Sequence, residues 1–218
     1  MTPNDPISLA HWRRTVAELY AAVRRAEDGE RACAQEAFRA ARDELFRTHP
    51  QSPLNEPAQQ AFAGLHYYPY DPAWRLAGII DIDVERVTYP VELPADGLLC
   101  YTRVAQVRFV YSDQPAQLSL FWMEGYGGGL FLPFLDETNT NETYGGGRYL
   151  YDTIKGADLG TNGSTLVLDF NFAYNPSCAY DDRWTCPLAP RENRLSFPVQ
   201  AGEKSFTSIP KHILGVTA

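Results

Sequence analysis

Two adjacent stretches with an apolar residue at nearly every second position constrain the fold most. The first covers residues 99–111 and the second covers residues 118–122. Between them lies SDQP at 112–115, which consists of residue types that favour turns. Alternation with a period of two is typical of strands that are buried on one face, and a short turn joins antiparallel neighbours. The sequence therefore predicts a long β-hairpin.

Further stretches with strand character extend this hairpin into a larger sheet. They are short, rich in β-branched and aromatic residues, and separated by Gly, Pro, Asn or Asp. No alternation of strand, helix and strand occurs, which argues against a parallel sheet. We expect a mainly β fold, an antiparallel β-barrel or sandwich of about 8–10 strands. The other expected strands are 74–82, 84–91, 130–134, 144–153, 164–171, 195–200 and 205–209.

Two amphipathic helices are predicted before the sheet, at about 8–26 and 30–47. In both, apolar residues recur at steps of three and four. Asp28-Gly29 separates the helices, and Pro50 follows the second one. We expect the two helices to form a hairpin.

This hairpin is predicted to be an N-terminal unit, residues 1–49, that packs on an antiparallel β domain of residues 50–218. The composition changes at Asp28-Gly29. We therefore expect the β domain to fold without residues 1–26.

The charge and hydropathy of the chain exclude several classes of partner. The formal net charge is −8, and no basic stripe with interleaved aromatic residues occurs, so a nucleic-acid partner is not expected. No apolar run approaches the length of a membrane span, so no membrane partner is expected. The first residues, MTPNDPISLAHW, do not resemble a secretory signal, and we expect a cytoplasmic protein. The oligomeric state cannot be predicted.

No cofactor or metal site is predicted. The glycine triplets at 127–129 and 145–147 lack the Lys-Ser/Thr and the helix of a phosphate-binding loop. They are more typical of bulges or of close backbone contacts. The four histidines are far apart in the sequence, and Cys178 and Cys186 do not have zinc-finger spacing. For these two cysteines a disulfide, a pair of thiols and simple burial remain open.

Residues 169–196 form the least regular part of the chain, and we expect them to be a functional loop or a cover over the core. Three prolines, at 176, 187 and 190, exclude a helix and most of a strand. The segment is nevertheless rich in aromatic residues, which favour burial. Long loops inside compact domains are often functional.

Polar residues gather in this segment and in the stretch around Arg148. A buried Arg148 needs a carboxylate, for which we consider Asp169 first and Glu142 second. The set could form a ligand pocket or a structural network, and the sequence does not decide between them. The candidate ligand-binding residues are Glu142, Tyr144, Arg148, Asp169, Asn171, Asn175, Tyr180 and Asn193.

Several separate runs resemble the bacterial and archaeal domain-of-unknown-function family 1684. The resemblance covers about residues 52–204, with Asn139-Thr-Asn141 and Ala189 as departures, and the first helix is an addition. It implies no activity. The matching runs include SPL at 52–54, FAGL at 62–65, LFLPF at 130–134, ETYGGGRY at 142–149, DFN at 169–171, AYNP at 173–176 and AGEK at 201–204.

Two functional hypotheses remain open. The first is a small-molecule-binding protein with an aromatic pocket and an Arg–carboxylate polar centre, because pockets are mostly apolar with a few placed polar groups. The alternative is a cofactor-independent enzyme of hydrolase, lyase or isomerase type. In it, Glu142 or Asp169 would act as the general base and Arg148 would stabilise an anion. No nucleophile–base pair is recognisable, so binding is preferred.

Overall fold

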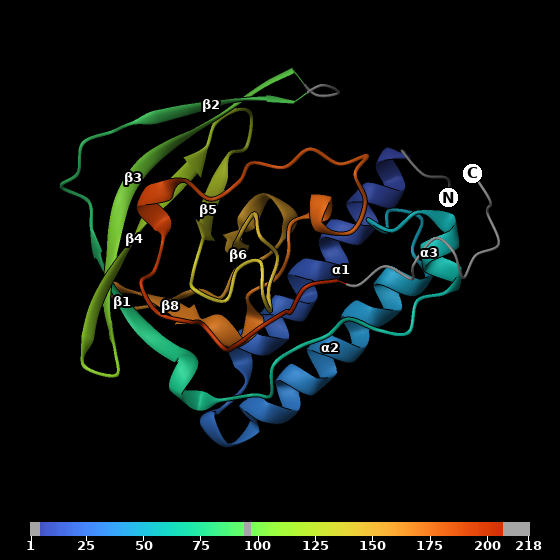
Figure 1. Cartoon of the computed structure of the whole chain (residues 1–218), viewed down its shortest axis with the longest axis horizontal. Coiled ribbons are helices and arrows are strands. Elements are labelled where there is room, and N and C mark those ends of the chain that lie inside the picture. The colour runs from blue at the N-terminus through green and yellow to red at the C-terminus, as the bar shows by residue number, and fades with distance from the viewer. Residues whose placement is uncertain (1–4, 94–96, 207–218) are drawn as a thin grey trace.

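The protein is a single curled antiparallel sheet with a helical hairpin packed against it (Figure 1). The computed structural model describes residues 5–93 and 97–206. The helices are α1 (Pro6–Arg25), α2 (Arg31–Thr48) and α3 (Glu56–Gln60). The strands are β1 (Arg75–Asp81), β2 (Thr88–Leu93), β3 (Gly97–Tyr111), β4 (Gln114–Met123), β5 (Gly129–Phe134), β6 (Arg148–Asp152), β7 (Thr161–Asn162) and β8 (Thr165–Asp169).

The strand order is β6-β5-β4-β3-β1-β8-β7, and β2 pairs with β3. Every pair of strands is antiparallel. This confirms the predicted mainly β fold with an N-terminal helical hairpin. The strands form one curled sheet that resembles half a barrel, not two stacked sheets (Figure 1).

The hairpin predicted from alternation is β3 and β4, joined by a tight turn in which Ser112 and Asp113 have positive φ. Pairing runs from Tyr111 and Gln114 back to Tyr101 and Met123. The register shifts between Arg103 and Ala105, which is a β-bulge.

The chain after Asn193 differs from the sequence prediction. No strand forms at 195–200; the residues run as extended chain with single bridges, such as that between Leu135 and Arg194. Side chains described below and single backbone bonds to Leu135 and Glu137 satisfy several of their polar groups in place of a partner strand. The expected strand 205–209 lies mostly outside the described residues. We call residues 195–206 the C-terminal segment.

Within residues 5–93 and 97–206, six short 3-10 turns connect these elements. They help to place side chains at the ends of strands and within the irregular 169–196 segment. They are η1 (Asp28–Glu30), η2 (Pro72–Trp74), η3 (Thr153–Lys155), η4 (Phe170–Phe172), η5 (Ser177–Ala179) and η6 (Arg191–Asn193).

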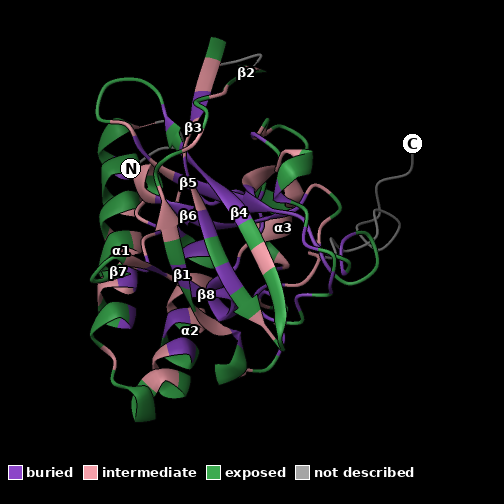
Figure 2. Ribbon diagram, turned by 90° about the vertical axis from the view of Figure 1, so that its left-hand side faces the viewer, coloured by how far each residue is buried: buried purple, intermediate pink, exposed green. Residues whose placement is uncertain are grey.

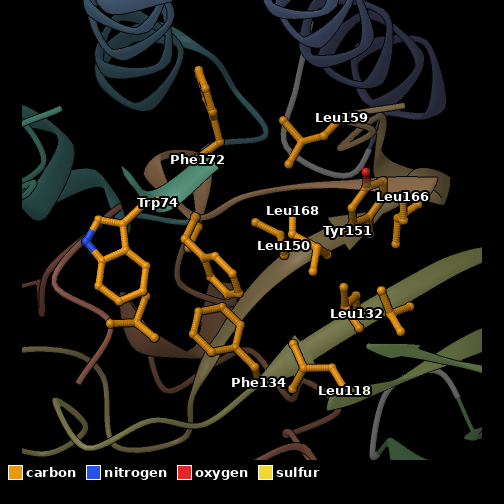
Figure 3. Packing of buried hydrophobic residues seen from close by; sticks show 14 of the residues in the cluster. Trp74, Leu118, Leu132, Phe134, Leu150, Tyr151, Leu159, Leu166, Leu168 and Phe172 are labelled. Carbon is orange, nitrogen blue, oxygen red and sulfur yellow. The ribbon is translucent and has the colours of Figure 1, made fainter. Parts of the chain in front are cut away.

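The main core lies between the inner face of the sheet and the two long helices (Figure 3). Leu118, Leu132 and Leu168 contribute from strands and are completely buried. The outer side of α1 is exposed, as Figure 2 shows. Alternation and helical periodicity thus direct one apolar face of each element into a common core.

The helices complete this core. Tyr20 and Val23 of α1 belong to the same buried cluster as the strand residues. The ring of Phe38 in α2 lies edge-on between Tyr20 and Phe172, with centroids 5.1 Å from each. Because removal of α1 would expose this cluster, we now expect a chain without residues 1–26 to fold poorly, contrary to the expectation from composition.

We predict that Phe38→Ala lowers the free energy of unfolding by about 3–5 kcal/mol, because it leaves a cavity between helix and sheet. Phe38→Leu keeps most of the volume and should cost less than about 1.5 kcal/mol. Urea denaturation of the two variants checks this. A cost of under about 1 kcal/mol for Phe38→Ala would show that the hairpin is a loose attachment.

Candidate functional site

Arg148 is the largest completely buried side chain of the protein that the structure describes. It is the first residue of β6 and follows Gly147, which has a φ of 89°. A Cβ at Gly147 would lie 2.5 Å from the carbonyl oxygen of Phe134, so only glycine permits this close contact between backbones. The close contact brings Arg148 directly into the interior.

The guanidinium of Arg148 binds one carboxylate and three backbone carbonyls. Nη2 donates to Oδ2 of Asp136 at 2.9 Å and to the carbonyl of Val199 at 2.8 Å. Nη1 donates to the carbonyls of Ala201 and Glu203. Arg148 therefore holds the C-terminal segment against the start of β6.

The partner of Arg148 is Asp136, and the prediction of Asp169 or Glu142 is wrong. Asp136 follows β5, which pairs with β6 so that Phe134 lies opposite Arg148. Both side chains of the ion pair are completely buried. Antiparallel register, which the sequence does not show, decides which carboxylate reaches the guanidinium.

Asp169 and Glu142 have other partners. Asp169 lies at the end of β8, where it accepts hydrogen bonds from Asn171 and faces Arg75 at 3.6 Å. Burial raises the pKa of the Asp169 carboxyl, and the contacts with Asn171 and Arg75 oppose that rise. Glu142 is at the surface, 3.7 Å from Lys204. The predicted Arg–carboxylate centre of a ligand pocket does not form from these residues.

Two of the predicted residues connect backbone segments through their side-chain amides. The side chain of Asn193 bonds to both backbone groups of Ser119 and to the carbonyl of Pro133, in the gap where β5 leaves β4. The side chain of Asn171 bonds to both backbone groups of Asp71. Each amide satisfies backbone groups that have no strand partner.

A second buried ion pair brings together two of the predicted residues and two that the sequence analysis missed. Glu203 of the C-terminal segment accepts from Arg42 of α2 at 3.0 Å, and their side chains are 1% and 12% exposed. Glu203 also accepts from the Asn175 side chain at 3.1 Å and from the Tyr180 hydroxyl. Burial raises the pKa of Tyr180 well above its ordinary value, and the Glu203 carboxylate adds to the rise.

The sequence does contain a sign that Arg42 is buried and paired. It occupies the apolar side of α2, four residues after Phe38 and four before Phe46. A charged residue on the buried face of a helix needs a buried partner. Burial alone would lower the pKa of Arg42, but the neighbouring Tyr180 and Glu203 raise it well above its usual range.

A cavity of about 440 Å³ opens beside this second ion pair. It lies between α1, which lines it from Pro6 to Tyr20, and the part of the irregular 169–196 segment that starts at Tyr174. Arg148 does not line it. Its lining includes Asp5, Pro6, Leu9, Trp12, Arg13, Val16, Tyr20, Arg42, Phe46, Gln51, Pro53, Tyr149, Lys155, Ala157, Tyr174, Asn175, Pro176, Ser177, Tyr180 and Trp184.

One end of the cavity is polar, and three polar atoms of its lining residues are buried without a hydrogen-bond partner among residues 5–93 and 97–206. They are Nε of Arg42, the hydroxyl of Tyr174 and Oδ1 of Asn175. We call these three residues and Tyr180 the polar end. Unsatisfied buried groups are costly, but these atoms have almost no accessible surface, so a molecule in the cavity would reach them only after a shift of neighbouring side chains.

The remaining predicted residue, Tyr144, lies elsewhere. Its hydroxyl contacts Sγ of Cys178 at 3.6 Å, and the Cys186 thiol is adjacent. In the described part of the chain, no group of three or more His, Cys, Asp or Glu side chains could hold a metal ion. None of the described helices has the length and hydropathy of a membrane span.

Comparisons with known proteins place the chain in a family. The model of the family described as "Protein of unknown function (DUF1684)" matches residues 60–204. The chain belongs to this family. This confirms the resemblance seen in the sequence. No curated protein matches the chain.

A solved structure has the same fold. It is the solution NMR structure of an uncharacterised protein of Haloarcula marismortui, 34% identical in sequence. The match covers 78% of this chain and 91% of that chain, with a TM-score of 0.57. The DUF1684 match includes the polar-end residues Tyr174, Asn175 and Tyr180, but it begins after α1 and α2, which also contribute to the cavity wall.

We predict that the Arg148–Asp136 pair is energetically coupled. Arg148→Met should lower the free energy of unfolding by about 3–5 kcal/mol, because it leaves a buried carboxylate without its cation. Asp136→Asn removes the charge but keeps an acceptor for the amides of Thr138 and Val199. The double variant with Arg148→Met and Asp136→Asn should lose about 1–3 kcal/mol less stability than the sum of the two single losses.

Urea denaturation of the four members of this cycle measures the coupling. Asp169→Asn combined with Arg148→Met is the matched control and should show no coupling, because Asp169 does not contact Arg148. Additive costs in the Asp136 cycle would contradict the assignment.

Proposed function

We propose that this protein binds an amphipathic small molecule in the cavity between α1 and the segment that begins at Tyr174. The observation that carries the proposal is the largely apolar cavity, whose lining residues include three with buried, unpartnered polar atoms: Arg42, Tyr174 and Asn175. The volume, about 440 Å³, is within the usual range of ligand pockets of about 300–1,000 Å³.

The apolar part of the ligand would contact α1 and the residues opposite it. Leu9, Trp12 and Val16 follow one another on the same face of α1, at steps of three and four residues. Trp184 lies on the opposite side, where its indole nitrogen donates to the carbonyl of Pro53 at 2.9 Å. Two indole rings in one lining favour an aromatic or other flat apolar group.

The polar part of the ligand would reach the polar end. Nε of Arg42 is a donor, Oδ1 of Asn175 is an acceptor, and the Tyr174 hydroxyl can be either. A group that both accepts and donates, such as an amide or a lactam edge, complements all three atoms. A carboxylate, which only accepts, would leave Asn175 unsatisfied.

The charged residues of the cavity lining do not reverse this preference for an amide over a carboxylate. Arg42 is already paired with Glu203, and Lys155 lies 3.2 Å from Asp152, whose carboxylate raises the pKa of Lys155. Two of the three cationic residues in the lining, Arg42 and Lys155, are therefore neutralised by carboxylate partners, and the third, Arg13, shares the lining with Asp5. We accordingly expect the neutral amide of an aromatic compound to bind more tightly than the corresponding carboxylate.

The catalytic alternative has less support. It required Glu142 or Asp169 beside Arg148. Arg148 is instead completely buried and paired with Asp136, and the carboxylates of Glu142 and Asp169 have other partners. A general base must come within hydrogen-bond distance of a substrate. The binding proposal needs no such group.

We predict that Tyr174→Phe weakens ligand binding about tenfold, because it removes a hydroxyl that the proposed ligand would pair with once neighbouring side chains move. The free variant should be at least as stable as the original protein, since the hydroxyl has no partner among the described residues. Thermal denaturation with a panel of matched aromatic amides and carboxylates identifies binders, and titration calorimetry then gives the affinity.

The matched control is Tyr67→Phe. The Tyr67 hydroxyl is also buried without a partner in the described ranges, but Tyr67 does not line the cavity. Tyr67→Phe should therefore leave the affinity unchanged. An equal loss in both variants, or binders that are insensitive to Tyr174→Phe, would contradict the proposed site.

A further inference from the structure

Cys178 and Cys186 meet beside the cavity. Cys178 lies in η5, directly after the lining residues Pro176 and Ser177. The backbone N–H of Cys178 donates to Sγ of Cys186 at 3.3 Å. The two cysteines are therefore neighbours in space.

Neither cysteine is deeply buried. Both are partly exposed and both are free thiols in the structure. Simple burial, one of the alternatives left open for these cysteines, therefore does not describe Cys178. A metal site is also not indicated, because the described residues contain no third ligand nearby.

The surroundings distinguish the two sulfurs. Cys178 receives hydrogen bonds from the Cys186 thiol and the Tyr144 hydroxyl, which lower its pKa to about 6, and Lys155 adds a smaller effect of the same sign. The contact with Cys178 and burial raise the pKa of Cys186. A thiolate beside a protonated thiol is the arrangement of an attacking and a resolving cysteine.

We propose that Cys178 and Cys186 form a redox-active dithiol that a hydroperoxide converts to a disulfide. The Cys178 thiolate attacks the peroxide oxygen, the O–O bond breaks, and a sulfenic acid and hydroxide (or alkoxide) form. Sγ of Cys186 then attacks Sγ of Cys178, the S–O bond breaks, and water leaves as the Cys186 proton is released. In total, two thiols and one hydroperoxide give one disulfide, one water and one water or alcohol.

The disulfide would close a loop that carries part of the cavity wall. Tyr180 and Trp184 lie between the two cysteines and both line the cavity. Oxidation therefore constrains the residues of the proposed ligand site. The thiol chemistry itself does not depend on that site.

Treatment of the full chain with one equivalent of hydrogen peroxide tests the proposal. Arg183 lies between the cysteines, so tryptic cleavage after it separates them, and a disulfide would join two peptides that dithiothreitol releases. We expect the 178–186 linkage as the main product. Cys33, which is exposed, is the internal control and should remain reduced. Preferential oxidation of Cys33, or sulfinic acid at Cys178 without linkage, would overturn the proposal.

Two variants test the assigned roles. In Cys186→Ser, peroxide should leave a sulfenic acid at Cys178 that dimedone captures, whereas Cys178→Ser should consume no peroxide at this site. Tyr144→Phe removes one donor to the Cys178 sulfur. If this raises the pKa by roughly one unit, alkylation of Cys178 by iodoacetamide at about pH 6 should slow about fivefold. Equal alkylation rates for Cys178 and Cys33 in the original protein would contradict the activated thiolate.

Discussion

The ion pair of Arg148 and Asp136 holds together the parts of the protein that local patterns do not explain. Its guanidinium bonds to three carbonyls of the C-terminal segment, which has no strand partner along most of its length. Asp136 also accepts the Val199 amide at 3.1 Å. The same segment carries Glu203, which binds Arg42 and Asn175 at the polar end of the cavity. The position of the cavity wall therefore depends on an interaction that lies outside the cavity.

This arrangement explains why an arginine is required at the start of β6. Burying a charge is costly unless its partner and its remaining donors are satisfied. The planar guanidinium presents five donors in a fixed geometry. The two terminal nitrogens of Arg148 reach four acceptors, and its Nε has no hydrogen-bond partner among the described residues. A lysine would offer a single nitrogen and could not span them. Gly202, in the segment that Arg148 binds, allows that segment to pack closely against the backbone of Ala173. A Cβ at this position would lie 2.6 Å from the carbonyl oxygen of Ala173.

Features with a local cause could be predicted from the sequence, and features that depend on register could not. Alternation at 99–111 and helical spacing at 8–26 identified β3 and α1. A buried Arg148 with a carboxylate partner was also predicted correctly, because burial of its neighbours implies it. The identity of that partner was not, since Asp136 becomes a neighbour only through the pairing of β5 with β6. Glu203 was missed for a similar reason: its buried partner Arg42 is on a helix 161 residues away in the sequence.

The four tryptophans provide a direct test of where a ligand binds. Trp12 and Trp184 line the cavity, whereas Trp74 is in the main core and Trp122 is on β4. NMR spectra of protein labelled with ¹⁵N at the indole nitrogen would follow all four during titration with the most stabilising aromatic amide. If the cavity is the binding site, the Trp12 and Trp184 signals shift in a saturable manner, and those of Trp74 and Trp122 do not. Saturable shifts at Trp74 or Trp122 alone would place the ligand elsewhere and contradict the proposed function.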